Sequence, residues 1–464
     1  MVSANGRSIK EKNCIFKKWS NCKESMKILL VFPRIEHGVI THKDRGSWRT
    51  IVSGYPIITL PHLAALTSRD HSVKIINENY DPIDFDEDVD LVGITCYTMT
   101  APRVYQIADE FRKRGKTVVL GGYHPTAIPK EARQHADSVV MGMAEASWPQ
   151  VIKDFGKGKL KPIYERNHDF DISMVPPLRR DLIKHNPFLG ALQTTRGCSN
   201  RCEFCAISSF CGNVVMQRPV KAVVEEIKNM PNKLFIFHDP HLTLHRKYAM
   251  ELFKEMIRQK IHKGWVANGT SNILGKVDKE FLELARKSGC VEWFVGFESV
   301  NQEALNNIKK THNKVEDFKK MIKRVHDYDM TIQGGIIFGF DEDTPDIFDT
   351  TLETINDWDL DVLEVNILTP YPGTPLFDRL ERDGRILTRD WSLYNQVNVV
   401  FKPKNMTEKE LLEGARKVAK EFYSSYNLLK KITKIMVTTK KFSGIIPAAT
   451  SVSYRRYYKR DFNF

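Results

Sequence analysis

The sequence has few cysteines and no long hydrophobic run. Eight cysteines in 464 residues are too sparse for a disulfide framework, and the first residues do not look like a signal peptide. No apolar run approaches the roughly 18–20 residues of a membrane-spanning helix. There is no internal repeat at solenoid spacing and no long low-complexity tract. We therefore expect a protein of the reducing cytoplasm, without a membrane span or a repeat architecture.

The composition is that of a globular protein with an excess of positive charge. The chain contains 42% hydrophobic and 27% charged residues, and its formal net charge is +13. Its length suggests two or three domains. Such a charge is compatible with an anionic membrane, an acidic substrate or nucleic acid, of which we do not expect nucleic acid. The end of the chain is rich in positive residues: Lys430, Lys431, Lys434, Lys440, Lys441, Arg455, Arg456, Lys459 and Arg460.

After a loose basic extension at residues 1–25, residues 26–165 alternate short apolar runs with helical patterns. Continuous apolar strands separated by helices predict a doubly wound parallel α/β sheet, flavodoxin-like or Rossmann-like, covered on both faces. The predicted strands are Lys27–Phe32, Val73–Asn77, Leu91–Thr95, Thr117–Leu120 and Ser138–Met141. The predicted helices include Leu60–Ser68, Ala101–Arg114 and Lys130–Gln134.

Ligands of such sheets bind at the carboxyl ends of the strands. Four residues at these ends are our candidates for ligand contact: Thr95, Gly121, Gly122 and Gly142. The glycines would let a large planar or phosphate-bearing ligand approach the backbone, although many folds place glycine after a strand.

A connector at residues 166–185 precedes a second run of strand–helix units at residues 186–387. This pattern predicts a partial six-stranded barrel of the TIM type, whose functional residues lie at the carboxyl ends of its strands. The predicted strands are Ala191–Thr195, Lys233–His238, Gly264–Asn268, Val291–Glu298, Thr331–Phe338 and Val362–Leu368. The predicted helices include Lys221–Asn229, Lys247–Gln259, Lys279–Ser288, Val315–Asp327 and Thr344–Trp358.

Three cysteines follow the first strand of this barrel with the spacing C-x3-C-x2-C. Cys198, Cys202 and Cys205 lie on one polar loop, and soft thiolate ligands at this spacing favour an iron–sulfur cluster or zinc. A four-iron cluster takes four ligands, so three cysteines would leave one iron open to a small molecule. A structural zinc site would need a fourth ligand, for which Cys211 is available.

The other cysteines carry less information. Cys96 and Cys290 lie in or beside apolar runs and are expected to be buried and inert. The roles of Cys14, Cys22 and Cys211 stay open.

The cysteine loop, with Phe204 just before the third cysteine, resembles the signature of the radical S-adenosylmethionine (SAM) superfamily. The resemblance implies that SAM chelates the open iron of a [4Fe–4S] cluster. An electron from the cluster then cleaves SAM and releases a 5′-deoxyadenosyl radical, which abstracts hydrogen from an unactivated carbon. It also implies a flavodoxin- or ferredoxin-type electron donor.

The same resemblance implies further contacts with SAM at the strand ends. Glu298, followed by Ser299, would accept hydrogen bonds from the ribose hydroxyls, and Asp239 would lie near the SAM amine. Gly335 and Gly339 would pack against the adenine. Each of these residues also has an ordinary structural explanation, as a solvated strand end or a tight turn.

The segment Val119–Thr126 resembles the cobalamin-binding domain that precedes many radical SAM cores. Thr95, Gly121, Gly122 and Gly142 would then contact cobalamin. The loop at residues 33–46 lacks the Asp-x-His-x-x-Gly motif whose histidine coordinates cobalt in domains of the methionine-synthase type. Cobalt therefore lacks a lower histidine ligand, or the domain no longer binds cobalamin; His37 and His42 are expected to be ordinary loop histidines.

Residues 388–464 are expected to determine the substrate and to end in a basic tail. Asp390–Trp391 and residues 400–407 resemble the C-terminal region of the hopanoid methylases and related lipid-modifying members. Farther on, Leu428, Leu429, Ile432, Ile435 and Met436 interleave with lysines at near-helical spacing. This segment is either a basic amphipathic helix on an anionic membrane or a helix that docks one face on the barrel.

Together these features predict an oxygen-sensitive radical SAM enzyme, cytoplasmic or peripheral on the inner face of the membrane. We expect cobalamin-dependent methylation of an unactivated carbon of a small-molecule or lipid-like substrate. Radical coupling, cyclisation or desaturation without cobalamin is the alternative among enzymes. A cobalamin-type sensor with a structural cluster is the alternative of another class, and an intact SAM pocket argues against it.

Overall fold

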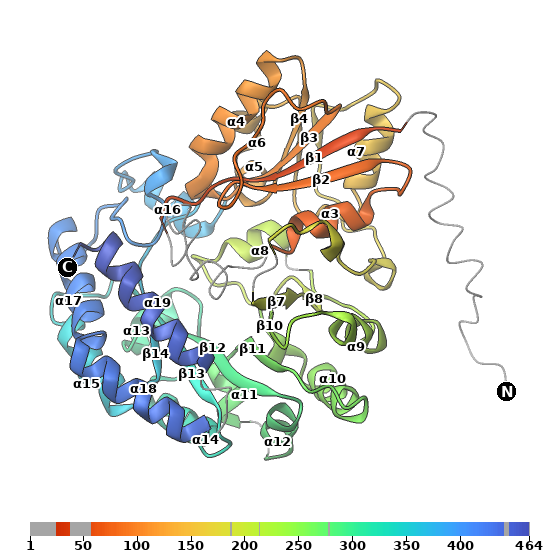
Figure 1. Ribbon diagram of the computed structural model, residues 1–464. Helices are drawn as coiled ribbons and strands as arrows, with labels where there is room; N and C mark the ends of the chain where they lie inside the picture. Colours follow the sequence, from red (N-terminus) through yellow and green to blue (C-terminus); the bar gives the residue numbers. More distant parts are fainter. Residues whose placement is uncertain are drawn as a thin grey trace. The chain divides into compact units, whose positions relative to one another are not determined.

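In the computed structural model the chain divides into two units, each built around a parallel sheet (Figure 1). The structure describes residues 25–37, 57–185, 188–212, 214–276, 279–439 and 445–463. Of these, residues 25–34 and 57–184 form the first unit, and residues 35–37 and those from 185 onward form the second. Cys14, Cys22 and His42 lie outside the described residues, and the finer predicted boundaries, such as 387/388, stay predictions.

The first unit contains a six-stranded sheet in the order β2-β1-β3-β4-β5-β6, in which every neighbouring pair is parallel. The strands are β1 (Lys27–Phe32), β2 (Ser72–Asn77), β3 (Leu91–Thr95), β4 (Thr117–Gly121), β5 (Ser138–Val140) and β6 (Ile163–Tyr164). The helices include α3 (Thr59–Leu66), α4 (Ala101–Lys113), α5 (Tyr123–Ala127), α6 (Pro129–His135) and α7 (Trp148–Phe155). This order places the topological switch point between β1 and β3, where ligands of such sheets bind.

The second unit contains the predicted six strands, also parallel, in the order β14-β13-β12-β11-β10-β7. The strands are β7 (Leu189–Leu192), β10 (Leu234–Phe237), β11 (Gly264–Gly269), β12 (Cys290–Glu298), β13 (Thr331–Phe338) and β14 (Val362–Ile367). The intervening helices are α8 (Ala206–Cys211), α9 (Val220–Asn229), α10 (Arg246–Arg258), α11 (Ser271–Lys276), α12 (Lys279–Lys287), α13 (Gln302–Asn307), α14 (Val315–His326), α15 (Ile347–Asp357) and α16 (Pro375–Arg382).

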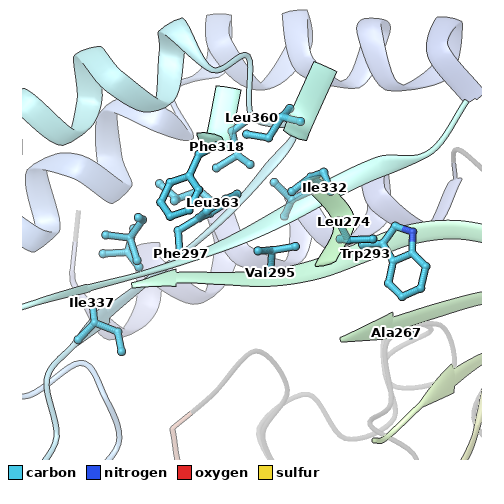
Figure 2. Close-up of a cluster of buried hydrophobic side chains, with 14 of the residues drawn as sticks. Ala267, Leu274, Trp293, Val295, Phe297, Phe318, Ile332, Ile337, Leu360 and Leu363 are labelled. Carbon is cyan, nitrogen blue, oxygen red and sulfur yellow. The ribbon is translucent and has the colours of Figure 1, made fainter. Parts of the chain in front are cut away.

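The core of the second unit lies between one face of the sheet and the helices. Trp293, Val295 and Phe297 alternate along β12 and are completely buried, as Figure 2 shows together with Ile332 and Leu363 from the next two strands. Period-two alternation places these residues on one face, so the intervening residues of β12 lie on the opposite, inner face. The inner face is therefore available to ligands.

The chain leaves the sheet earlier than the sequence suggests at the first strand of this unit. We expected a strand over Ala191–Thr195, but β7 ends at Leu192. The buried carboxylate of Asp239 accepts hydrogen bonds from the backbone N–H groups of Thr194 and Thr195, which replace the sheet pairing.

Three helices complete the second unit: α17 (Glu408–Phe422), α18 (Ser425–Thr439) and α19 (Ile445–Asp461). Figure 1 shows α18 and α19 side by side; α17 and α19 pack on β14, and α18 contacts β13. β14 is an edge strand, and its outward backbone groups are paired with tyrosine hydroxyls. Tyr423 bonds the N–H and C=O of Leu363, and Tyr458 bonds those of Val365.

No helix in the described part of the chain combines the length and apolar character needed to span a bilayer.

Candidate active site

A short antiparallel ladder forms the base of the cysteine loop. β8 (Thr195–Arg196) pairs with β9 (Met216–Gln217), so the chain between them is held at both ends. Gly197 follows β8 with a φ of 78°, and a Cβ atom there would overlap the carbonyl oxygen of Val214. Only glycine fits this position, which sets the direction of the chain into Cys198.

The carboxylate of Asp239 holds the start of this loop. It is completely buried and accepts hydrogen bonds from the amides and hydroxyls of Thr194 and Thr195, with a distance of 2.6 Å from the Thr195 hydroxyl. Burial raises the pKa of Asp239, and these hydrogen bonds act in the opposite direction. The structure thus gives Asp239 a positioning role, while its expected contact with the SAM amine stays a prediction.

The thiols of Cys198, Cys202 and Cys205 lie close enough to affect one another electrostatically. Burial raises the pKa of all three, that of Cys202 to about 12, and the ammonium group of Lys310 acts in the opposite direction. Among the described residues, no three His, Cys, Asp or Glu side chains gather as tightly as a single metal ion requires. Cys211, the other candidate zinc ligand, is buried at the end of α8.

Glu203 ties the cysteine loop to two other segments. Its N–H donates to the carbonyl of Ile308, and its own carbonyl accepts from the N–H of Leu376 at the start of α16. Its carboxylate binds Arg379 at 2.7 Å, and Arg379 also binds Asp341 at 2.7 Å. The loop is therefore fixed from the carboxyl ends of β12 and β13 and from α16.

Beside the loop lies a buried ion pair that we did not anticipate from the sequence. The carboxylate of Glu298, at the end of β12, pairs with the ammonium group of Lys310. Burial alone would lower the pKa of Lys310, but Glu298 and the thiols of Cys202 and Cys205 raise it. A buried cation beside three thiols would offset the negative charge of thiolate ligands.

The backbone at Glu298 departs from strand geometry so that this pair can form. Glu298 has a φ of 67°, and the register of β12 against β13 shifts between Gly296 and Glu298. A Cβ atom at Gly296 would overlap the carboxylate of Glu298 and come within 3.0 Å of Lys310 Nζ. The missing side chain of Gly296 thus leaves the space that the ion pair occupies.

Three histidines near the loop are held neutral. Burial lowers the pKa of His238 to about 4, and burial together with Lys310 lowers that of His241 to about 3 and that of His312 to about 4. At neutral pH these rings carry no charge, so Lys310 supplies positive charge here.

The remaining predicted SAM contacts lie at the same end of the sheet. Gly335 is paired with Gly296, and the N–H of Gly339, whose φ is 108°, donates to Asp343. Ser299 is buried and accepts the N–H of Asn301, and Phe204 packs against the core. Their contacts with SAM stay predictions.

In the first unit, the loops after β3, β4 and β5 form the candidate cobalamin site. Tyr97 follows β3, is 38% exposed, and stacks on Tyr123 with ring centroids 5.9 Å apart. Gly122 has a φ of 113°, and a Cβ atom there would lie 2.7 Å from the carbonyl oxygen of Cys96. These stacked rings at the carboxyl ends of two strands suit the flat face of a macrocycle such as cobalamin.

The other residues predicted to contact cobalamin lie at the same edge of the first sheet, at the carboxyl ends of its strands. Thr95 is buried at the end of β3, and Gly121 ends β4. The N–H of Gly142 donates to the hydroxyl of Thr126 at 2.9 Å, which joins the loop after β5 to α5. In the second unit, the ring of His37 pairs with Asp461 at 3.0 Å. The contacts with cobalamin itself stay predictions.

Comparison with known protein families gives the following matches. Residues 192–355 match the radical SAM superfamily, residues 56–152 match the B12 binding domain, and residues 374–450 match a domain of unknown function, DUF4070.

The relatives include the bacteriochlorophyllide d C-12(1)-methyltransferase of Chlorobaculum tepidum, with 30% identity over 81% of this chain and 84% of the relative. The hopanoid C-2 methylase of Rhodopseudomonas palustris is 25% identical over 79% of this chain and 72% of the relative. Among solved structures, the radical SAM methyltransferase TsrM from Kitasatospora setae has a TM-score of 0.64 at 19% identity, covering 78% of this chain and 77% of that one.

These matches confirm the predicted fold class and the expected cofactors: a [4Fe–4S] cluster, SAM and cobalamin. The chain belongs to the radical SAM superfamily, in the group that carries a B12-binding domain ahead of the radical SAM domain.

Proposed function

We propose that this protein methylates an unactivated carbon of a small-molecule substrate with a largely apolar skeleton. The observation that carries the proposal is the 30% identity, over 81% of the chain, with a methyltransferase that acts on a bacteriochlorophyllide. A hopanoid methylase is also a relative, which favours a large ring system or lipid as substrate.

The described residues have separate roles in this reaction. When bound, the cluster supplies the electron that cleaves SAM, and cobalamin carries the methyl group. Cys198, Cys202 and Cys205 would hold the cluster, and the Glu298–Lys310 pair would orient SAM beside it. Tyr97 and Tyr123 would support the corrin ring in the first unit.

The absent Asp-x-His-x-x-Gly motif makes cobalamin the part of the proposal to test first. The protein is purified without oxygen from cells supplied with cobalamin, and iron, cobalt and optical spectra are measured. We expect about four irons and about one cobalt per chain. Iron without cobalt would overturn methyl transfer and favour radical chemistry that needs no cobalamin.

The variant Cys202→Ala tests the radical step separately. It should form no 5′-deoxyadenosine from SAM, whereas Cys290→Ala, which changes a buried cysteine away from the loop, should keep this activity. Continued deoxyadenosine formation by Cys202→Ala would contradict the cluster assignment.

We also infer a peripheral membrane contact through α18 and an external electron donor of the flavodoxin or ferredoxin type. Support for the membrane contact is an exposed apolar stripe on α18, formed by Tyr426, Leu429, Met436 and Val437. Leu428 and Ile435 of the same helix are buried against the unit, so the helix docks one face and leaves another exposed.

A further inference from the structure

The inner face of the second sheet carries a polar cluster that neither the iron–sulfur cluster nor SAM accounts for. On β14, Glu364 and Asn366 are partly exposed, whereas the residues between and beside them are buried. Gln333 is partly exposed on the neighbouring strand β13. The alternation places all three on the inner face of the sheet, opposite core residues such as Ile332 and Leu363.

The register of the strands relates this cluster to the expected SAM site. Gly296 of β12 is paired with Gly335 of β13, and Gly335 is paired with Glu364 of β14. The Glu298–Lys310 pair fills the space at Gly296, and the ring of Phe294 lies against Gly335. Glu364 thus lies two strands from Gly296, about 10 Å away.

The contacts of Glu364 are all with neutral groups. Its carboxylate accepts hydrogen bonds from the hydroxyl of Tyr454 at 2.7 Å, from Asn366 Nδ2 at 3.2 Å and from Gln333 Nε2 at 3.3 Å. Among the described residues, no lysine, arginine or histidine forms an ion pair with it. A partly exposed carboxylate that has no counter-charge among the described residues can accept one from a cationic ligand.

Three tyrosines lie near this carboxylate. Tyr454 reaches it from α19, and the ring of Tyr457 lies 6.4 Å from that of Tyr454. Burial and then the Glu364 carboxylate raise the pKa of Tyr371, which places Tyr371 near the same group. Faces of tyrosine rings attract cations, so rings and carboxylate together favour an organic cation over an anion or an alkane.

We infer that Glu364, with Tyr454 and Gln333, binds a protonated amino group of the substrate. The inference rests on the proposed function, because it places this amine beside the site where SAM is cleaved. It adds to the apolar skeleton a charged nitrogen that sets the orientation of the substrate. It also gives α19 a task in recognition, since α19 supplies Tyr454.

The test uses three probes of one shape and different charge: 4-fluorobenzylamine, 4-fluorobenzyl alcohol and 4-fluorobenzoate. Their binding to the oxidised holoenzyme is measured by fluorine NMR titration. We expect the amine to bind at least about tenfold more tightly than the alcohol, and the benzoate to bind more weakly still. Equal binding of amine and alcohol, or binding of none of the three, would overturn the inference.

Variants of Glu364 show whether its carboxylate causes the preference for the amine over the alcohol. Glu364→Gln should reduce the preference for the amine to about threefold or less, and Glu364→Asp, which keeps the charge, should retain part of it. Glu353→Gln, at an exposed position of α15, is the matched control and should behave as the unchanged protein. An undiminished preference in Glu364→Gln would also refute the inference.

The same preparations separate this inference from the proposed function. If the unchanged holoenzyme forms deoxyadenosine and contains cobalt but shows no preference for the amine, only the inference fails. If it lacks cobalt, the proposed function fails, whatever the probes do.

Discussion

At the scale of single residues, the site depends on places where a side chain is missing or a charge is buried. Gly197 and Gly296 leave room for a carbonyl group and for an ion pair, respectively. Lys310 then places a positive charge beside the thiols of the cysteine loop. If the cysteines bind the cluster as proposed, these neighbours would shape the space and the charge around it.

Gly197→Ala should prevent cluster assembly. The substitution strains a backbone with positive φ, at a cost of about 1–2 kcal/mol, and also forces Val214 to move. We expect less than about one iron per chain after anaerobic reconstitution, against about four in the unchanged protein.

The matched control is Gly384→Ala, which has a similar φ of 65° but open space around the new methyl group. Its folding free energy should fall by a similar amount because of the backbone strain, but it should keep its iron. If Gly197→Ala retains a full complement of iron, the overlap with Val214 does not constrain the loop.

The sequence reveals the site only where a short pattern carries the chemistry. The spacing of Cys198, Cys202 and Cys205 is enough to propose them as ligands because all three lie on one loop. The sequence does not identify Lys310 as a site residue. It lies in a polar stretch and becomes buried only when that stretch packs beside β12. Asp239 was expected near SAM, whereas its contacts with Thr194 and Thr195 arise from the meeting of two strand ends.

At the scale of elements, the apolar runs predicted the longer strands within a residue or two. The predicted end of β7 was wrong because the carboxylate of Asp239 competes with the sheet for the backbone amides of Thr194 and Thr195. β6, with two residues, and the short helices α5 and α8 carry too little periodicity to be recognised. Packing on β14 by α17 and α19 depends on tyrosines that are distant in sequence.

The tyrosines on β14 replace a neighbouring strand. Each hydroxyl donates to one carbonyl group and accepts from one N–H group, so the edge presents fewer free backbone groups. Because Glu364 lies between the two bonded residues, Leu363 and Val365, this pairing also fixes the strand that carries the inferred amine site.

Tyr458→Phe should loosen this edge without leaving a hole. The ring remains, but the N–H and C=O of Val365 lose their partner, which should cost about 1–3 kcal/mol of unfolding free energy. Hydrogen exchange at the Val365 amide should become faster, as measured by mass spectrometry of peptides from β14.

Tyr457→Phe is the control, because the Tyr457 hydroxyl makes no hydrogen bond with any residue that the structure describes. Its effect on stability should be smaller than that of Tyr458→Phe. Equal losses of stability in the two variants would mean that the hydrogen bonds of the Tyr458 hydroxyl contribute little to the stability of the β14 edge.

At the scale of the whole molecule, much of the positive charge near the end of the chain is used internally. Lys431 donates to the carbonyl of Leu360, Lys434 pairs with Asp361, and Arg460 pairs with Asp461. Lys431 and Lys434 tie α18 to the residues just before β14, and all three cations are less available to an anionic surface than the sequence suggests. What remains exposed on α18 is chiefly apolar, with Lys430 beside it.

This distribution leads to a prediction for membranes. Exposed Leu429 and Val437 would insert into the interfacial region while Lys430 contacts headgroups, so binding should require anionic lipid and weaken with salt. The protein should co-sediment with phosphatidylglycerol vesicles and much less with phosphatidylcholine vesicles. The double variant Leu429→Glu/Val437→Glu should abolish sedimentation, whereas Leu387→Glu, at another exposed leucine away from α18, should not. Failure of the unchanged protein to bind either vesicle, or binding that the double variant retains, would show that α18 does not contact a membrane.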